Sequence, residues 1–216
     1  EIFVNRHFEN VFQVKNISSG KSIKKFVDEN EPKKAVVIGA GYIGLEMAEQ
    51  LQRLGLEVSL LQRSKYPMSH LDWDMSSRII NEMKRKNIAF FPEETVRKVN
   101  GDGRLKSIET AKGTIFSADI FVLATGVKPN TALAKSMGIK LGITGAIEVN
   151  DKLETNLPNV YAVGDVAESF DCITRLPIYR PLASTANKMG RIAGDVITGG
   201  NLRHKGILGT GILRFF

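Results

Sequence analysis

One stretch decides the fold of this chain: KAVVIGAGYIGLE, residues 34–46. Its apolar run, Ala35–Ile38, predicts a buried parallel strand. The apolar residues that follow keep helical spacing up to Gly55, which predicts an amphipathic helix. A second apolar run, Leu56–Leu61, predicts another strand. The sequence therefore contains a complete strand–turn–helix–strand unit.

Three glycines join the first strand to the helix. Gly39 permits a tight turn, Gly41 lets a pyrophosphate approach the backbone, and Gly44 lets the helix pack closely on the strand. The phosphates would lie at the helix N-terminus, where free N–H groups and the helix dipole favour negative charge. A glycine-rich turn without a ligand is the competing interpretation, but the strand before it and the helix after it favour a dinucleotide site. The residues predicted to hold the pyrophosphate are Gly39, Ala40, Gly41, Tyr42, Ile43 and Gly44.

Composition excludes several classes of protein. The 216 residues suffice for one large domain or one and a half. The single cysteine, Cys172, excludes an internal disulfide and suits a reducing compartment, so we expect a cytoplasmic protein. No apolar run approaches the length of a membrane span, and we expect no membrane partner. The net charge of +7 is spread in pairs and triples of basic residues, so we expect no nucleic-acid partner either.

The residues after the second strand predict which dinucleotide is used. An Asp or Glu there would bond the ribose 2′-hydroxyl of NAD(H), whereas an Arg accommodates the 2′-phosphate of NADP(H). This chain has Gln62, Arg63, Ser64 and Lys65, so two cations and a hydroxyl are available and no carboxylate repels a phosphate. A solvated basic loop is the alternative. We predict that Arg63 contacts the 2′-phosphate with help from Ser64 and, as a further candidate, Lys65, while Gln62 still allows NAD(H) to bind.

The following pattern predicts an α/β fold that changes from parallel to antiparallel. A helix with a buried stripe of Met75, Ile79, Ile80 and Met83 precedes a third strand. Short alternating segments separated by glycine turns then predict a three-stranded antiparallel meander. We expect one domain from about Pro32 to about Ile147. The predicted elements are a helix at 72–86, strands at 88–91, 95–99, 105–110, 114–117, 119–123 and 146–149, and a short helix at 131–137.

A second informative stretch lies near the end of the chain. The apolar run before Gly164 predicts a strand that carries Asp165 at its tip, where the carboxylate can reach a sugar or polyol hydroxyl. A capped turn is the alternative, since Asp is common in turns. A helix predicted over 181–197 begins with small residues, which let a ring-shaped cofactor approach its N–H groups.

Several motifs together resemble the FAD-dependent pyridine nucleotide-disulfide oxidoreductases. They are GAGYIGLE at 39–46, ATG with KPN at 124–130, and TNLPNVYAVGD at 155–165. The stretch PLASTANKMGR at 181–191 is similar to the branch of coenzyme A-disulfide reductases, NADH oxidases and NADH peroxidases. The Gln62-Arg63-Ser64 stretch is most similar to the coenzyme A-disulfide reductases that use NADPH.

The resemblance implies roles for individual positions. Tyr42 would cover the flavin ring until nicotinamide displaces it, and Glu46 would lie near the contact between flavin and nicotinamide. Asp165 would bond the flavin ribityl chain. The other implied positions are Gly126 and Val127 beside the nicotinamide, Gly164 beside Asp165, Leu182, Ala183, Ser184 and Thr185 near the flavin pyrimidine edge, and Asn187 facing the substrate.

The resemblance also implies an activity and its cofactors. Hydride would pass from NAD(P)H through FAD to a small-molecule disulfide such as coenzyme A disulfide. Reduction of oxygen or peroxide is the alternative, as is a standalone nucleotide-binding or redox-sensing module. The first GxGxxG and the redox cysteine of the family are absent from these 216 residues, and Cys172 is interpreted as incidental. We therefore expect this chain alone to be inactive and the full-length protein to be a homodimer.

The same resemblance implies a domain organisation. Residues 1–31 would be the end of an FAD-domain segment with a linker helix, and residues 32–148 the NAD(P)-binding domain. Residues 149–200 would be the C-terminal part of the FAD-binding domain. Residues 201–216 would begin a truncated dimerisation domain.

Overall fold

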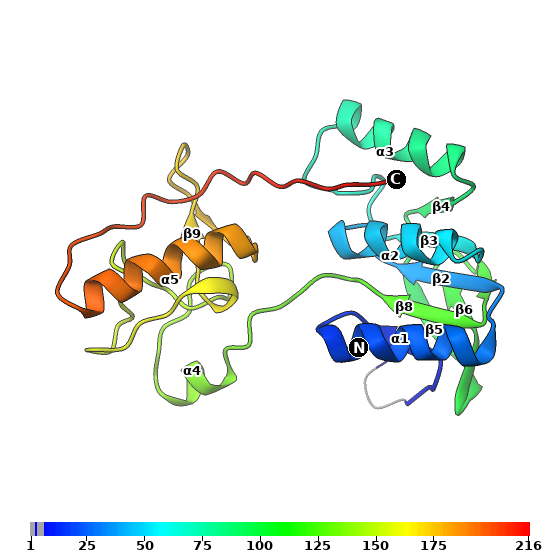
Figure 1. Ribbon diagram of the computed structural model, residues 1–216, viewed down its shortest axis with the longest axis horizontal. Coiled ribbons are helices and arrows are strands. Elements are labelled where there is room, and N and C mark those ends of the chain that lie inside the picture. The colour runs from blue at the N-terminus through cyan, green and yellow to red at the C-terminus, as the bar shows by residue number, and fades with distance from the viewer. Residues whose placement is uncertain (1–2, 4–6) are drawn as a thin grey trace. The chain divides into compact units, whose positions relative to one another are not determined.

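The computed structural model describes Phe3 and residues 7–216 (Figure 1). These residues form two compact units, each considered by itself below. Unit 1 runs to Gly126 and also includes the terminal segment Leu213–Phe216. Unit 2 is Val127–Ile212.

Unit 1 is built on a five-stranded sheet in the order β1-β8-β2-β3-β4, in which every pairing is parallel. This confirms the predicted α/β class and its parallel sheet. The strands are β1 (Val11–Gln13), β2 (Lys34–Ile38), β3 (Glu57–Gln62), β4 (Ala89–Pro92) and β8 (Ile120–Leu123), and the helices are α1 (Ile17–Asn30), α2 (Tyr42–Arg53) and α3 (Trp73–Arg85).

The central strands are buried on both faces, which explains their continuous apolar runs. Successive side chains of a strand point to opposite faces. Val37 accordingly packs with residues of the three helices, including Phe26, Leu45 and Met83. Its neighbour Val36 packs on the other face with residues of the meander, including Ile108.

The meander forms as the sequence predicted. Strands β5 (Val96–Asp102), β6 (Arg104–Thr110) and β7 (Ile115–Ser117) pair antiparallel in that order. Gly103 makes the first turn with a positive φ of 61°. The predicted apolar stripe of α3 is correct for Met83, which is fully buried, but Met75 is 49% exposed.

The N-terminal segment belongs to unit 1, although the sequence assigned residues 1–31 to a different domain. β1 adds to the sheet edge beside β8. The buried Asn10 side chain fixes this edge, because its amide nitrogen donates to the carbonyls of Leu105 and Asp119 while its oxygen accepts from the Leu105 N–H. α1 begins at Ile17, because Asn16 and Ser19 form a capping box at its N-terminus.

Unit 2 contains α4 (Ala132–Ser136), the short 3₁₀ turn η1 (Gly164–Val166), β9 (Ser169–Phe170), β10 (Pro177–Ile178) and α5 (Ala183–Ile197). Its core gathers Ile139, Ile147, Leu153 and Met189. Residues 127–148 thus pack in unit 2, whereas the sequence placed them with the nucleotide-binding domain.

Two predicted strands of unit 2 are reduced to isolated bridges. Residues 146–149 contribute only Ile147, and the apolar run before Gly164 contributes only Tyr161. The backbone turns through positive φ at Leu153 (66°) and Asn159 (61°), so no extended ladder can continue through this region. The predicted strand ahead of Asp165 is therefore wrong, and the 3₁₀ turn η1 holds that residue.

A buried pair of a histidine and a serine lies elsewhere in unit 2. The Ser169 hydroxyl lies 2.7 Å from Nε2 of His204, and both side chains are buried. Burial, with a smaller contribution from the Lys188 charge, lowers the pKa of His204. His204 lines a cavity of about 180 Å³ that also contacts Glu148 and Glu168, and the backbone N–H of His204 donates to the Asp151 carbonyl.

We predict that this pair makes unit 2 acid-labile. The folded-state pKa of His204 lies below its unfolded value of about 6.5, so the unfolded chain takes up this proton first. Stability then falls as pH drops below about 6.5. Thermal unfolding at pH 5 and pH 7.5 should show a smaller pH effect for His204→Phe combined with Ser169→Ala than for the wild type. His7→Gln, at an exposed position, serves as the control, and equal pH effects in all three proteins would contradict the assignment.

We also predict that Gly39 is much less replaceable than Gly55, another glycine of unit 1. Its φ is +106°, and a Cβ there would collide with the Ala124 carbonyl. Gly55 has a similar φ of +88° but open space around it. Gly55→Ala should therefore lower the free energy of unfolding by about 1–3 kcal/mol through backbone strain alone. Gly39→Ala should lower it by more, because the ends of β2 and β8 must also move apart. Urea unfolding measures both, and equal losses would show that the Ala124 contact is unimportant.

Candidate functional site

The turn from β2 to α2 brings three backbone segments into contact. A Cβ on Gly39 would collide with the Ala124 carbonyl, and a Cβ on Gly44 would collide with the Gly39 carbonyl. Gly41 differs, because nothing lies within 4 Å of the position its Cβ would take. The first and third glycines therefore serve close packing, and the second faces open space where a ligand can approach.

The N-terminus of α2 suits an anion. Gly41 is its N-cap and has no side chain to accept from the first-turn N–H groups. The helix carries no acidic residue in its first turn, so no carboxylate competes for this end. Free N–H groups and the positive end of the helix dipole together favour a phosphate. The predicted pyrophosphate residues, 39–44, are thus contiguous at the carboxyl end of β2, and they fit a dinucleotide.

The end of β3 is hydrogen-bonded to this turn. Oε1 of Gln62 accepts from the Ala40 N–H at 3.2 Å. Nε2 of Gln62 donates to the Ser64 hydroxyl at 2.7 Å, and that hydroxyl lies 3.0 Å from the Tyr66 carbonyl and donates to it. The structure therefore brings the predicted cofactor-selecting residues next to the predicted pyrophosphate residues.

The two basic residues of this loop differ in their surroundings. Arg63 is exposed, and no ion pair or hydrogen bond of its side chain is found among the described residues. Lys65 is also exposed, but a hydrogen bond with the Tyr66 hydroxyl raises its pKa, and its ammonium lies 5.3 Å from the Tyr66 ring centroid. Arg63 is therefore the cation of this loop whose side chain has no partner among the described residues, and Lys65 stays a further candidate.

Sequence reasoning missed an aromatic pair beside this loop. The rings of Tyr66 and Trp73 lie 4.7 Å apart, and Trp73, the only tryptophan, is 56% exposed. Tyr42, at the start of α2, lies near the His70 ring in the same way, at 5.8 Å. A Trp at the start of this helix, outside its apolar stripe, was the signal that could have indicated the pair.

Unit 2 holds a second group of predicted residues. Gly164, with φ of +74°, lies against Ala186 of α5, so η1 packs on the first turns of that helix. The Tyr179 hydroxyl donates to the Asp165 carbonyl at 2.9 Å, and burial and the Asp165 charge raise the Tyr179 pKa. The exposed Asp165 carboxylate is left free for a hydroxyl-bearing ligand. Leu182, the N-cap of α5, gives its first turn, Ala183, Ser184 and Thr185, no side-chain acceptor.

The remaining predicted residues are on the surface. Glu46 on α2 and Asn187 on α5 are exposed. Gly126, with φ of +102°, ends unit 1, and Val127, which begins unit 2, is 54% exposed. Their assigned roles stay predictions. No cluster of metal-ligating side chains is found in the described part of the chain.

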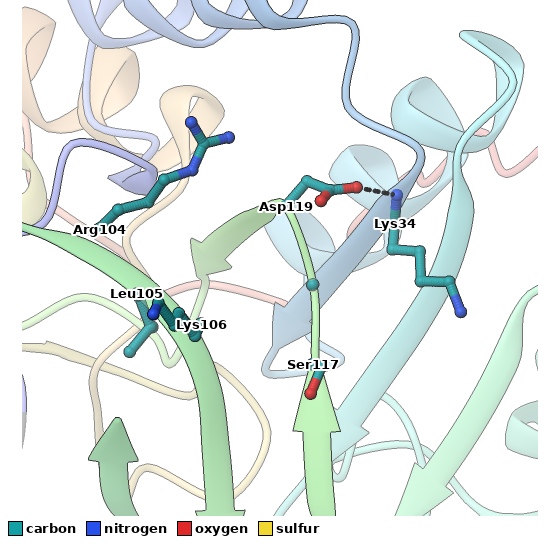
Figure 2. Close-up of a pocket in the computed structure, with 7 residues that line it drawn as sticks. Lys34, Arg104, Leu105, Lys106, Ser117 and Asp119 are labelled. Atoms are coloured by element: carbon teal, nitrogen blue, oxygen red, sulfur yellow. Dashed lines mark hydrogen bonds between the residues drawn. The ribbon is translucent and has the colours of Figure 1, made fainter. Parts of the chain in front are cut away.

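A cavity of unit 1 lies away from the predicted nucleotide site. It measures about 300 Å³ and is lined by Lys34, Arg104 and Asp119 among others, so it lies at the amino end of β2. Figure 2 shows the Arg104 and Lys34 side chains pointing apart, and each pairs with a different carboxylate, Glu9 or Glu57. Asp119 instead accepts from the Lys34 N–H at 2.9 Å. These charges do not converge on a common ligand.

A parallel sheet with a glycine turn, an open helix N-terminus and a polar strand end defines a Rossmann-type dinucleotide-binding protein. A family model described as pyridine nucleotide-disulphide oxidoreductase matches residues 7–190. The chain therefore belongs to the pyridine nucleotide-disulphide oxidoreductase family, as its motifs predicted. Among the described residues, no helix is long and apolar enough to cross a membrane.

Two curated relatives show where this chain lies within the family. It is 37% identical over 194 residues to the NAD(P)H coenzyme A polysulfide/persulfide reductase of Pyrococcus horikoshii, covering 90% of this chain and 43% of that protein. It is 35% identical over 206 residues to the coenzyme A disulfide reductase of Staphylococcus aureus, covering 95% and 46%. The chain thus spans about half the length of these relatives.

Two solved structures share the fold. Reduced Bacillus anthracis CoADR-RHD superposes with a TM-score of 0.93 and 33% identity, over 100% of this chain and 40% of that one. An engineered water-forming NADPH oxidase bound to NADPH, made from the Lactobacillus brevis oxidase LbNOX, has a TM-score of 0.82 and 29% identity, over 91% and 43%.

Proposed function

We propose that unit 1 binds a nicotinamide dinucleotide and prefers NADPH to NADH. The observation that carries this proposal is the position of Arg63, which is exposed at the end of β3 directly after a residue bonded to the glycine turn. A guanidinium forms charge-assisted, often bidentate bonds with a phosphate. The pyrophosphate would lie on the N-terminus of α2, and the 2′-phosphate beside Arg63.

The engineered NADPH oxidase supports this choice. Its changes replace a run of Asp, Ala and Met by Ala, Arg and Ser, which creates an Arg-Ser pair. Another of its changes affects a glycine that lies 18 residues before that Asp. The same spacing separates Gly44 from Gln62 here, so Arg63 and Ser64 fall at the positions of the introduced Arg and Ser.

The match to that oxidase is incomplete. A further change introduces an Arg seven residues after the replaced Asp. At the same spacing from Gln62, this chain has Ser69. Arg63 would therefore act without a second guanidinium, and a moderate preference for NADPH follows.

We expect Arg63→Ala to weaken NADPH binding about tenfold and to leave NADH nearly unchanged, because only NADPH carries the 2′-phosphate. Because Arg63 is exposed, the loss of NADPH affinity should lie near the lower end of what charge-assisted hydrogen bonds contribute. High salt should reduce this loss further. Energy transfer from Trp73 to the bound nicotinamide measures both dissociation constants. Arg97→Ala, at an exposed position on β5, is the matched control.

One result would contradict the assignment. If wild-type protein binds NADH as tightly as NADPH at low salt, the basic loop is a solvated turn and carries no specificity.

For the whole protein we propose a flavoprotein reductase of coenzyme A-linked sulfur–sulfur bonds. The relatives named above are reductases of a coenzyme A disulfide and of a coenzyme A polysulfide or persulfide. With a disulfide substrate, NADPH and one proton would be consumed, the S–S bond would break, and two thiols and NADP⁺ would result. Bound FAD would supply the two-electron step between nicotinamide and sulfur.

Unit 2 offers residues that fit a flavin. Gly164 keeps the backbone open next to α5, and the Asp165 carboxylate is available for the hydroxyls of a ribityl chain. The uncapped first turn of α5 offers N–H groups to the polar edge of a ring. We propose that Asp165 and residues 182–185 hold the flavin and that Asn187 faces the substrate.

We expect this chain alone to bind NADPH without turnover, and the full-length gene product to oxidise NADPH when coenzyme A disulfide is added. Absorbance at the NADPH band together with thiol titration measures the stoichiometry of two thiols per NADPH. NADPH oxidation that depends on oxygen and needs no disulfide would instead identify an oxidase. Turnover by the 216-residue chain without any partner would contradict the proposal.

A further inference from the structure

Three hydrogen bonds run in series from the glycine turn into the basic loop. The Ala40 N–H donates to Oε1 of Gln62, Nε2 of Gln62 donates to Oγ of Ser64, and Oγ of Ser64 donates to the Tyr66 carbonyl. The donor–acceptor distances are 3.2, 2.7 and 3.0 Å. Gln62 and Ser64 are half-buried, whereas Arg63 between them is exposed.

This series has one consistent direction. A backbone N–H can only donate and a backbone carbonyl can only accept, so both ends of the series are fixed. The Gln62 amide must therefore turn its oxygen to Ala40 and its nitrogen to Ser64. A carboxylate at position 62 could accept from Ala40 but could not donate to Ser64. The residue types at 62 and 64 are thus matched to each other.

The backbone of the same loop is also held. The Gln62 carbonyl accepts from the Glu94 N–H at 2.9 Å, and the Ser64 carbonyl accepts from the Glu93 N–H at 3.3 Å. The residues on both sides of Arg63 are therefore fixed by side chain and by main chain. Ordering Arg63 on a ligand then costs only the rotamers of its own side chain.

We propose that Gln62 and Ser64 are positioning residues for NADPH recognition: their hydrogen bonds tie the basic loop to the glycine turn and thereby present Arg63 to the 2′-phosphate. The proposal rests on the proposed NADPH preference of unit 1. It reassigns Ser64, which the sequence predicted to bind the phosphate itself. The Ser64 proton is directed to Tyr66, so Ser64 acts through Arg63.

A double-mutant cycle tests this dependence. Ser64→Ala in the 216-residue chain should raise the NADPH dissociation constant about three- to tenfold, because the loop on either side of Arg63 loses its anchor. In the Arg63→Ala background, the same Ser64→Ala change should have no further effect on NADPH. A direct bond from Ser64 to the phosphate would instead survive there as a loss of similar size.

Two further variants separate positioning from general damage to the fold. Ser64→Thr keeps the hydroxyl and should restore NADPH binding to within twofold of wild type. Gln62→Ala should cost about as much as Ser64→Ala, and the two together should cost no more than either alone, because each breaks the same series. NADH binding should stay within twofold in Ser64→Ala, since a merely structural loss would weaken both dinucleotides equally.

The outcomes distinguish this inference from the function it rests on. If wild-type protein shows no preference for NADPH, the proposed cofactor choice itself fails. If wild type prefers NADPH and Arg63→Ala removes the preference while Ser64→Ala leaves it intact, the function stands and the positioning role is overturned. An additive loss in Ser64→Ala with Arg63→Ala would also overturn it.

Discussion

The close approach of Gly39 to the Ala124 carbonyl is the constraint on which the nucleotide site depends. β2 and β8 are neighbours in the sheet, and their carboxyl ends meet where Gly39 turns. Gly44 lies over the Gly39 carbonyl with no room for a side chain, so α2 can start directly above this edge. Close backbone contact therefore directs the helix N-terminus toward the space that Gly41 leaves open. Phosphate binding follows from this packing and needs no charged side chain.

Specificity for one dinucleotide depends on a separate group of residues at the end of the neighbouring strand, β3. The carboxyl end of β3 lies beside that of β2, so residues 62–66 reach the same edge of the sheet. Hydrogen bonds to Ala40 make this loop an extension of the glycine turn. The residues that bind the pyrophosphate, which both dinucleotides share, thus differ from those that recognise the 2′-phosphate. Substitution at Arg63 can therefore change the preference for NADPH without changing the affinity for the pyrophosphate.

Much of unit 1 could be predicted from sequence because its signals are local. The glycine spacing, the buried strands and the hairpin turns each depend on residues close together in the chain, and all three were placed correctly. Signals that depend on distant residues were missed: Asn10, directly before β1, is bonded to the meander through Leu105, 95 residues away. The strand predicted before Asp165 failed because apolar residues there pack in a compact core without a partner ladder. The Ser64 hydroxyl points into its own loop and not toward a ligand. This direction could not be predicted from sequence, because a hydroxyl in a basic loop fits a phosphate equally well.

Nuclear magnetic resonance of the ¹⁵N-labelled chain during titration with NADPH tests the central claim most directly. The account predicts that the largest amide shifts fall in residues 39–44 and 62–66, with NADH reproducing the first group and much less of the second. Shifts centred on Lys34, Arg104 and Asp119 at the opposite edge of the sheet, or no saturable shifts at all, would contradict it.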